Sequence, residues 1–149
     1  MVNAPKEIAH AVLIVDGAYV LQLRDDIPGI PARGMWSLFG GALENGETPE
    51  AGLRREIAEE LGIALPGCRP LWQVDRFSEF WGSVLRFWFL VADVTALWPS
   101  HVVREGRGAR LFRFHELPAS EIPPIIPRYD LYQAKSDWLN QKWTELIVG

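Results

Sequence analysis

The segment from Gly41 to Ile63 constrains this chain more than any other part of its sequence. It opens as a glycine-rich loop and continues into an acidic stretch with helical spacing. Thr48 is a typical N-cap residue, and Pro49 suits the first helical turn because its missing N–H would have no partner there. Gly62 suits the left-handed position that ends a helix. The segment therefore predicts a helix between Thr48 and Gly62.

This predicted helix has two faces of different chemistry. Three carboxylates at i, i+3 and i+4 project from one side: Glu56, Glu59 and Glu60. Three aliphatic residues at i, i+4 and i+8 form a separate stripe that can anchor the helix to a core: Leu53, Ile57 and Leu61. Like charges at this spacing repel each other by roughly a few tenths of a kcal/mol per pair. We therefore expect a hard divalent cation such as Mg²⁺ or Mn²⁺ among the carboxylates.

The segment as a whole resembles the signature motif of the Nudix hydrolases. That motif is Gly, five residues, Glu, seven residues, and then Arg-Glu-aliphatic-any-Glu-Glu-any-Gly-aliphatic. This chain fills every fixed position: Gly41, Glu47, Arg55, Glu56, Ile57, Glu59, Glu60, Gly62 and Ile63. A solvated acidic helix is the alternative interpretation, and it does not account for a complete match.

The resemblance implies an α/β/α sandwich around a central mixed sheet, in the α+β or α/β class, with a single Nudix hydrolase domain over 1–149. The remaining sequence fits this order of elements. Period-two and apolar patterns predict strands over 8–16, 19–24, 36–39, 71–77, 84–94 and 109–114. Apolar residues at helical spacing predict a second helix over 129–148.

The resemblance also assigns roles to individual residues. It implies that carboxylates of the helix and one backbone carbonyl bind one to three metal ions: Glu56, Glu59, Glu60 and Gly40. It implies structural roles for four further positions of the motif: Gly41, Glu47, Arg55 and Gly62. Glu47 and Arg55 would form an ion pair that braces the loop against the helix, although Glu47 could instead join the metal cluster.

The motif does not fix which acid accepts the proton of the attacking water. Glu59 is one candidate, and the others are Glu105 and Glu79, which lie in loops beside the central strands. We favour Glu105, because its glycine neighbours would allow a mobile loop to close over substrate and metal. Glu79 lies in a shorter turn beside Trp81 and could contact the rim of the substrate. The alternative for both acids is a solvated surface position.

Outside the motif, Arg24 and Trp81 are the residues that we expect to bind substrate. Arg24 lies beside a loop where it could meet phosphate, and Trp81 is the tryptophan least typical of a core position. His10 lies in a buried-strand pattern, which predicts a core histidine with satisfied hydrogen bonds.

Composition limits the partners of the chain. A net charge of −4 argues against general binding to nucleic acids or to anionic membranes. No apolar run reaches the length of a membrane span. The single cysteine, Cys68, excludes an intrachain disulfide and favours a reducing, cytoplasmic setting. A homodimer is left open.

The Nudix resemblance, together with the three helix carboxylates, implies Mg²⁺-dependent hydrolysis of a diphosphate bond in a nucleoside diphosphate linked to another moiety. The metal would neutralise the diphosphate and lower the pKa of the attacking water. Two alternatives remain: a catalytically silent Nudix-fold sensor of nucleotides, and a Nudix-type hydrolase of RNA ends or of non-nucleotide diphosphates. The sequence does not select the substrate, because the selecting loops lie outside the motif.

Overall fold

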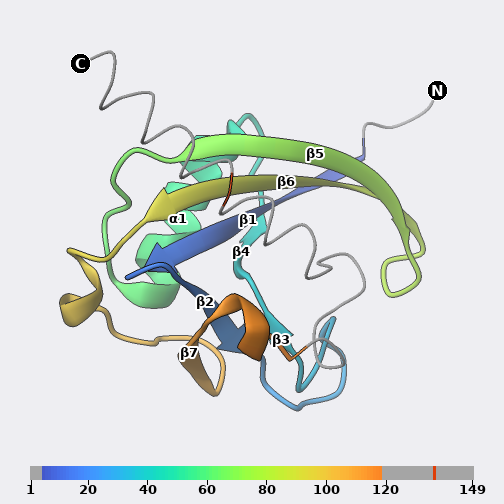
Figure 1. The fold of residues 1–149 in the computed structure, drawn as a ribbon. Coiled ribbons are helices and arrows are strands. Elements are labelled where there is room, and N and C mark those ends of the chain that lie inside the picture. Colours follow the sequence, from blue (N-terminus) through green and yellow to red (C-terminus); the bar gives the residue numbers. More distant parts are fainter. Residues whose placement is uncertain (1–4, 119–135, 137–149) are drawn as a thin grey trace.

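Seven strands form one sheet in the computed structural model of the protein, which describes residues 5–118 and Ser136 (Figure 1). The strands are β1 (Lys6–Val15), β2 (Ala18–Leu23), β3 (Trp36–Ser37), β4 (Phe39–Ala42), β5 (Arg69–Ser78), β6 (Ser83–Asp93) and β7 (Gly108–Phe112). They are accompanied by helix α1 (Pro49–Leu61) and the short 3₁₀ helices η1 (Trp98–Ser100) and η2 (Phe114–Glu116). Most of the predicted strands differ from the observed bounds by only one or two residues at either end.

The sheet is mixed, as predicted. Its main order is β3-β2-β1-β6-β5, with β4 paired to β1 and β7 paired to β2. The β1–β6 pair is parallel, and the other strand pairs are antiparallel. β1 has β6 along one edge; along its other edge lie β4, beside residues 8–11, and β2, beside residues 13–15.

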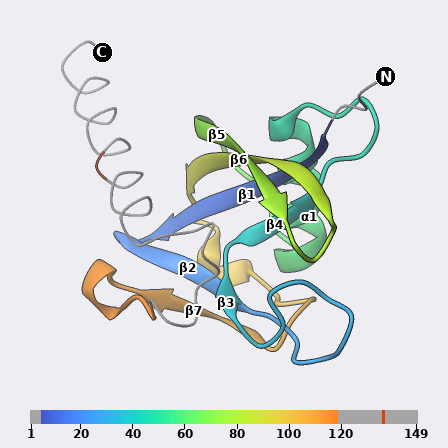
Figure 2. The same cartoon turned by 90° about the vertical axis from the view of Figure 1, so that its right-hand side faces the viewer.

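Helix α1 packs against one face of this sheet (Figure 2). Its predicted caps are both present, since the Thr48 hydroxyl accepts the Ala51 N–H at 3.2 Å and Gly62 adopts a φ of 66°. The aliphatic stripe of α1 is fully buried against alternate residues of β1: Ala9, Ala11 and Leu13. The side chains at helical spacing in α1 therefore pack against the alternate side chains of β1, as the two periodicities predicted.

The opposite face of the sheet carries a second apolar cluster built on the other residues of β1. Val12 and Ile14 pack there with Tyr19 and Phe89. The predicted helix over 129–148 lies outside the described residues. In the part of the chain that the structure describes, no helix is long and apolar enough to cross a membrane.

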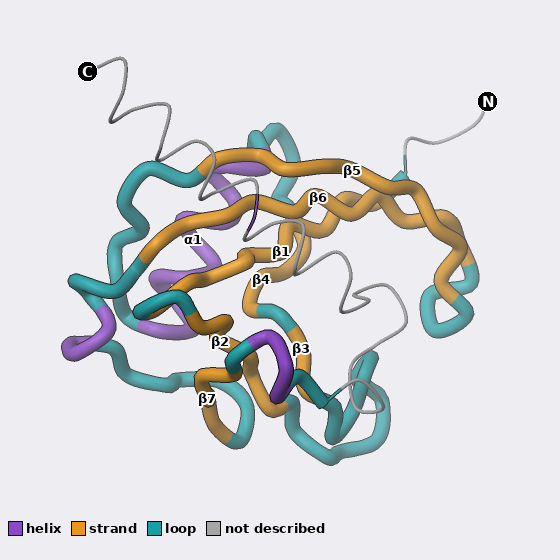
Figure 3. Tube along the Cα trace, viewed as in Figure 1, coloured by secondary structure: helices purple, strands orange, loops and turns teal. Residues whose placement is uncertain are grey.

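The predicted strand over 36–39 is wrong in its extent. The structure has two short strands there, and the second continues through Gly40 and Gly41, which pair with His10 and Ala9 of β1. Gly40 has a φ of 141°, and a Cβ atom at this position would lie 2.0 Å from the Ala9 carbonyl oxygen. Glycine therefore lets β4 approach β1 closely, whereas sequence patterns associate a Gly-Gly pair with a loop. Figure 3 shows this strand and the surrounding loops.

Replacing Leu53 with alanine tests the packing of the helix. Leu53 is fully buried, so we expect Leu53→Ala to lower the free energy of unfolding by about 2–5 kcal/mol in urea titrations. Val102→Ala is the matched control, because Val102 is 56% exposed and its truncation should change stability by no more than about 0.5 kcal/mol. Equal stability of the two variants would show that the stripe does not anchor α1.

Candidate active site

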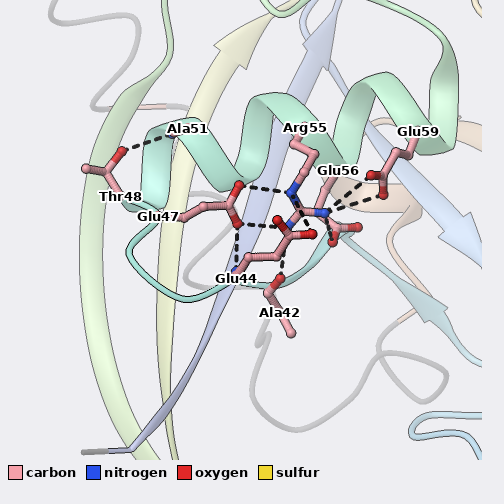
Figure 4. A network of polar contacts seen from close by, with 8 residues as sticks. All are labelled: Ala42, Glu44, Glu47, Thr48, Ala51, Arg55, Glu56 and Glu59. Carbon is pink, nitrogen blue, oxygen red and sulfur yellow. Dashed lines mark hydrogen bonds and ion pairs between the residues drawn. The ribbon is translucent and has the colours of Figure 1, made fainter.

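Arg55 lies at the centre of a network of carboxylates on the outer side of α1 (Figure 4). Its Nε and Nη2 atoms donate to the two carboxylate oxygens of Glu47 at 2.9 and 2.8 Å, and Nη2 also donates to the Ala42 carbonyl at 3.1 Å. These hydrogen bonds hold the pKa of Glu47 down at about 2. The structure thus brings Glu47 and Arg55 together as a bidentate pair that links the loop, β4 and the helix.

The three helix carboxylates differ in their surroundings. Arg55 Nη1 donates to Glu56 at 3.0 Å, and it reaches Glu59 only at 3.4 Å. The Glu56 side chain is 15% exposed and that of Glu59 is 53% exposed. Among the described residues, no three or more His, Cys, Asp or Glu side chains form a ready metal-binding group, so the assignment of Glu56, Glu59 and Glu60 as ligands stays a prediction.

Glu60 is the buried member of this group, with 2% of its surface exposed. One of its carboxylate oxygens accepts the backbone N–H of Gly40 at 3.0 Å. Glu56 lies against the next residue, since a Cβ atom on Gly41 would be 2.6 Å from the Glu56 carboxyl carbon. Gly41 therefore leaves room for Glu56 beside β4, whereas Gly40 contributes its backbone N–H to Glu60.

This crowding disfavours the charged forms of both acids. Burial, followed by the charges of Glu56 and Glu105, raises the pKa of Glu60 to about 8, against the Gly40 hydrogen bond and the Arg24 charge. Burial also raises the pKa of Glu56, mainly against the influence of Arg55. A divalent cation would stabilise the charged carboxylates, and oxygen donors of this kind are those that Mg²⁺ and Mn²⁺ prefer. The donor set therefore fits the predicted metal.

The structure brings Glu105 to this group from a distant part of the sequence. The N–H of Arg104 donates to the Glu60 carbonyl at 2.9 Å, which joins the loop to the end of α1. On the other side, the Gln22 side chain donates to the Glu105 carbonyl at 3.2 Å. Gly106 packs so closely on β2 that a Cβ atom there would lie 2.7 Å from the Leu23 carbonyl oxygen.

The loop around Glu105 is thus fastened to both α1 and β2, whereas the sequence suggested glycines that give it freedom. Gln22 is a residue that our sequence reasoning missed. The available signal was a polar side chain in a strand pattern, and it is only 3% exposed. Buried amides are usually hydrogen-bonded, so such a position indicates a specific partner.

A cleft with a volume of about 500 Å³ lies on the sheet face opposite α1 and reaches β4 at Gly40 and Gly41. Both predicted substrate-binding residues, Arg24 and Trp81, line it, and so does Glu79. Trp81 is 48% exposed, in agreement with its non-core pattern.

His10 also lines this cleft, and the prediction that it is a satisfied core histidine is wrong. Its buried Nδ1 atom has no hydrogen-bond partner among the residues that the structure describes, and its ring packs against Phe87 and Phe89. Burial, with a smaller effect of Arg24, lowers its pKa to about 4, so the ring is neutral at pH 7. The buried-strand pattern that suggested burial could not reveal that the ring borders a cleft.

Comparison with known proteins identifies the family. The sequence model of the NUDIX domain matches residues 5–132. The crystal structure of a MutT NUDIX hydrolase from Burkholderia pseudomallei superposes with a TM-score of 0.72 and 27% identity, covering 88% of this chain and 98% of that one. A MutT protein from Methanosarcina mazei Go1 has the same fold, with a TM-score of 0.72 at 21% identity over 92% and 97% of the two chains.

Similarity to curated sequences is confined to a shorter stretch. Over 51 residues the chain is 54% identical to proteins named nucleoside triphosphatase NudI from Escherichia coli O139:H28 and Shigella flexneri. This stretch is 34% of the chain and spans about a third, 35%, of those relatives. The chain belongs to the NUDIX domain family, and the prediction of a Nudix-type hydrolase is confirmed at the level of that family.

Neutralising Glu60 should stabilise the metal-free protein. Because the folded pKa of about 8 exceeds the ordinary value of 4.5, the folded state binds more protons between these values, and stability falls as pH rises through them. We expect Glu60→Gln, which keeps the acceptor for Gly40, to melt higher than the parent at pH 8 in EDTA and to lose this advantage near pH 4.5. Glu79→Gln, at an exposed position, is the control. A difference that does not depend on pH would contradict the burial effect.

Proposed function

We propose that this chain is a divalent-metal-dependent hydrolase of a diphosphate bond in nucleoside diphosphate derivatives. The observation that carries the proposal is the placement of Glu60 and Glu56 against the backbone of Gly40 and Gly41, with Glu105 acting electrostatically on both. Acids gathered in this way, beside a cleft of ligand size, are suited to bind metal ions that hold phosphates.

Each residue of the site has a separate proposed role. Glu56 and Glu60 would be the main metal ligands, with the more exposed Glu59 and the Gly40 carbonyl completing the shell. The bound metal would neutralise the diphosphate and make a water molecule more acidic. Glu105 would accept the proton of that water, because its loop is fastened beside Glu60. Arg55 and Glu47 would keep the helix and β4 in register.

The cleft would hold the nucleoside. Arg24 lies between the cleft and the acids, since its charge acts on both His10 and Glu60. Its Nε donates to the Pro31 carbonyl at 2.9 Å, which orients the guanidinium and leaves its Nη groups for phosphate. Trp81 would contact the nucleoside at the rim. The names of the similar NudI and MutT proteins support nucleotides, including nucleoside triphosphates, as substrates to test.

A phosphate-release screen tests the function. We expect turnover of at least one class among nucleotide sugars, dinucleotides, ADP-ribose and nucleoside triphosphates with Mg²⁺ or Mn²⁺. EDTA should abolish it and added metal should restore it, because the charge stabilisation supplied by metal is worth several kcal/mol. Full turnover in EDTA would refute the metal-dependent mechanism. Nucleotide binding without turnover would support the alternative of a catalytically silent sensor. Activity confined to RNA ends would support the alternative of a Nudix-type hydrolase of RNA ends.

Comparison of two loop acids tests the proton acceptor. We expect Glu105→Gln to lower kcat by at least about 10²-fold and to flatten the acidic limb of the pH profile, as for loss of a general base. Glu79→Gln is the matched control in the cleft and should retain most of the turnover. Glu60→Gln, measured in parallel at saturating Mg²⁺, should lose at least about 10²-fold as a ligand variant. If Glu79→Gln lost its turnover while Glu105→Gln kept normal turnover, Glu79 and not Glu105 would be the proton acceptor.

A further inference from the structure

The cleft is positively charged although the chain has a net charge of −4. Three cationic side chains line it, Lys6, Arg24 and Arg76, against one carboxylate, Glu79. Within the described residues, none of these three cations forms an ion pair. Arg24 lies near Glu60 and can serve the diphosphate, which leaves Lys6 and Arg76 without a role in the proposed reaction.

Strand register places Lys6 and Arg76 in one row. Leu85 of β6 is paired with Lys6 of β1 on one side and with Arg76 of β5 on the other. Because neighbouring strands lie about 4.8 Å apart, the two Cα atoms are separated by roughly 10 Å across the sheet. All three side chains line the cleft, so the two cations flank an apolar residue on the same face.

This row is distant from the acids. His10 is paired with Gly40, whose N–H binds Glu60, and Lys6 lies four residues away along β1. At about 3.3 Å per residue, this separation is roughly 13 Å. Between the two ends, Ile8 and Phe87, which pair with each other across β1 and β6, line the cleft with apolar surface. An anionic group at Lys6 must therefore be distinct from a diphosphate held at Glu60.

The tip of the β5–β6 hairpin contributes Trp81 to the same end of the cleft. The Lys6 ammonium lies 3.8 Å from the centre of the Trp81 ring. This cation–π contact holds the ammonium over the rim, and it leaves the three N–H groups of Lys6 without a carboxylate partner among the described residues. Arg76 adds a fork of donors that suits phosphate oxygens.

We propose that Lys6 and Arg76 form a second anion-binding subsite, so that the preferred substrate carries another anionic group beyond its scissile diphosphate. A ring of the substrate would cover the apolar surface between the two charged groups. This inference rests on the proposed function and adds to it the class of substrate, a nucleoside diphosphate derivative with an additional phosphate on a sugar.

Matched substrate pairs that differ by one phosphate test the subsite. The pairs are 2′-phospho-ADP-ribose and ADP-ribose, NADPH and NADH, and coenzyme A and its 3′-dephospho form. We expect kcat/KM to be at least about 10-fold higher for the phosphorylated member of one or more pairs, as charge-assisted hydrogen bonds allow. The preference should arise mainly in KM and should shrink as salt is raised.

Single-charge variants identify the residues responsible. Lys6→Gln and Arg76→Gln should each reduce the preference to about 3-fold or less, while Arg76→Glu should reverse it, because like charges repel. Arg110→Gln is the matched control: it removes one positive charge from β7, outside the cleft, and should keep the preference. Lys6 and Arg76 are exposed, so the melting temperatures of these variants should stay close to that of the parent, with Lys6→Gln losing only the exposed cation–π contact.

Binding of both members of each pair, measured by calorimetry in the presence of Ca²⁺ and compared with their turnover, separates this inference from the proposed function. Equal turnover of both members in all three pairs would overturn the subsite and leave the hydrolase function standing. Tighter binding of phosphorylated members that is lost in Lys6→Gln, without turnover of any substrate, would support the subsite and refute the hydrolase. A preference that survives in both glutamine variants, or no binding of any phosphorylated member, would overturn the subsite.

Discussion

The contact between the helix carboxylates and the backbone of β4 is the constraint on which the rest of the site depends. Glu60 can be buried only because the Gly40 N–H is free to donate to it, and Glu56 can lie beside it only because Gly41 has no side chain. A strand that brings two glycines to the edge of β1 is therefore needed before the acids can gather. The fully buried stripe of α1 then fixes the helix over that edge.

Arg55 limits the repulsion among the outer acids. It contacts Glu47, Glu56 and, at longer range, Glu44 and Glu59, so four carboxylates share one guanidinium. Glu60 lies apart from this network and is left with a backbone N–H as its donor. The result is an uneven cluster in which Arg55 compensates part of the charge of the outer acids and does not contact the inner one. A metal ion would stabilise the charged form of such an inner carboxylate.

The position of β4 beside β1 also joins two regions of opposite charge. The acids lie on the α1 side, and the cationic cleft lies on the other face of the sheet, reaching Gly40 and Gly41 from that side. An extended anionic ligand could pass from one region to the other around this strand. Because the loop that carries Glu105 is fastened to α1 and to Gln22 of β2, the acid site is braced independently of the cleft.

The sequence by itself determined the local features of this protein. Helical spacing and caps located α1 between Thr48 and Gly62, and apolar runs and period-two alternation located most of the strands, because these patterns depend only on residues close together in the chain. Only the tertiary structure decided which acids meet, since it buries Glu60, leaves Glu59 exposed and brings in Glu105 from a distant loop. It likewise placed Gly40 and Gly41 in a strand and His10, Lys6 and Arg76 at one cleft. These relations join residues far apart in the chain, and they are set by strand register, which no local pattern records.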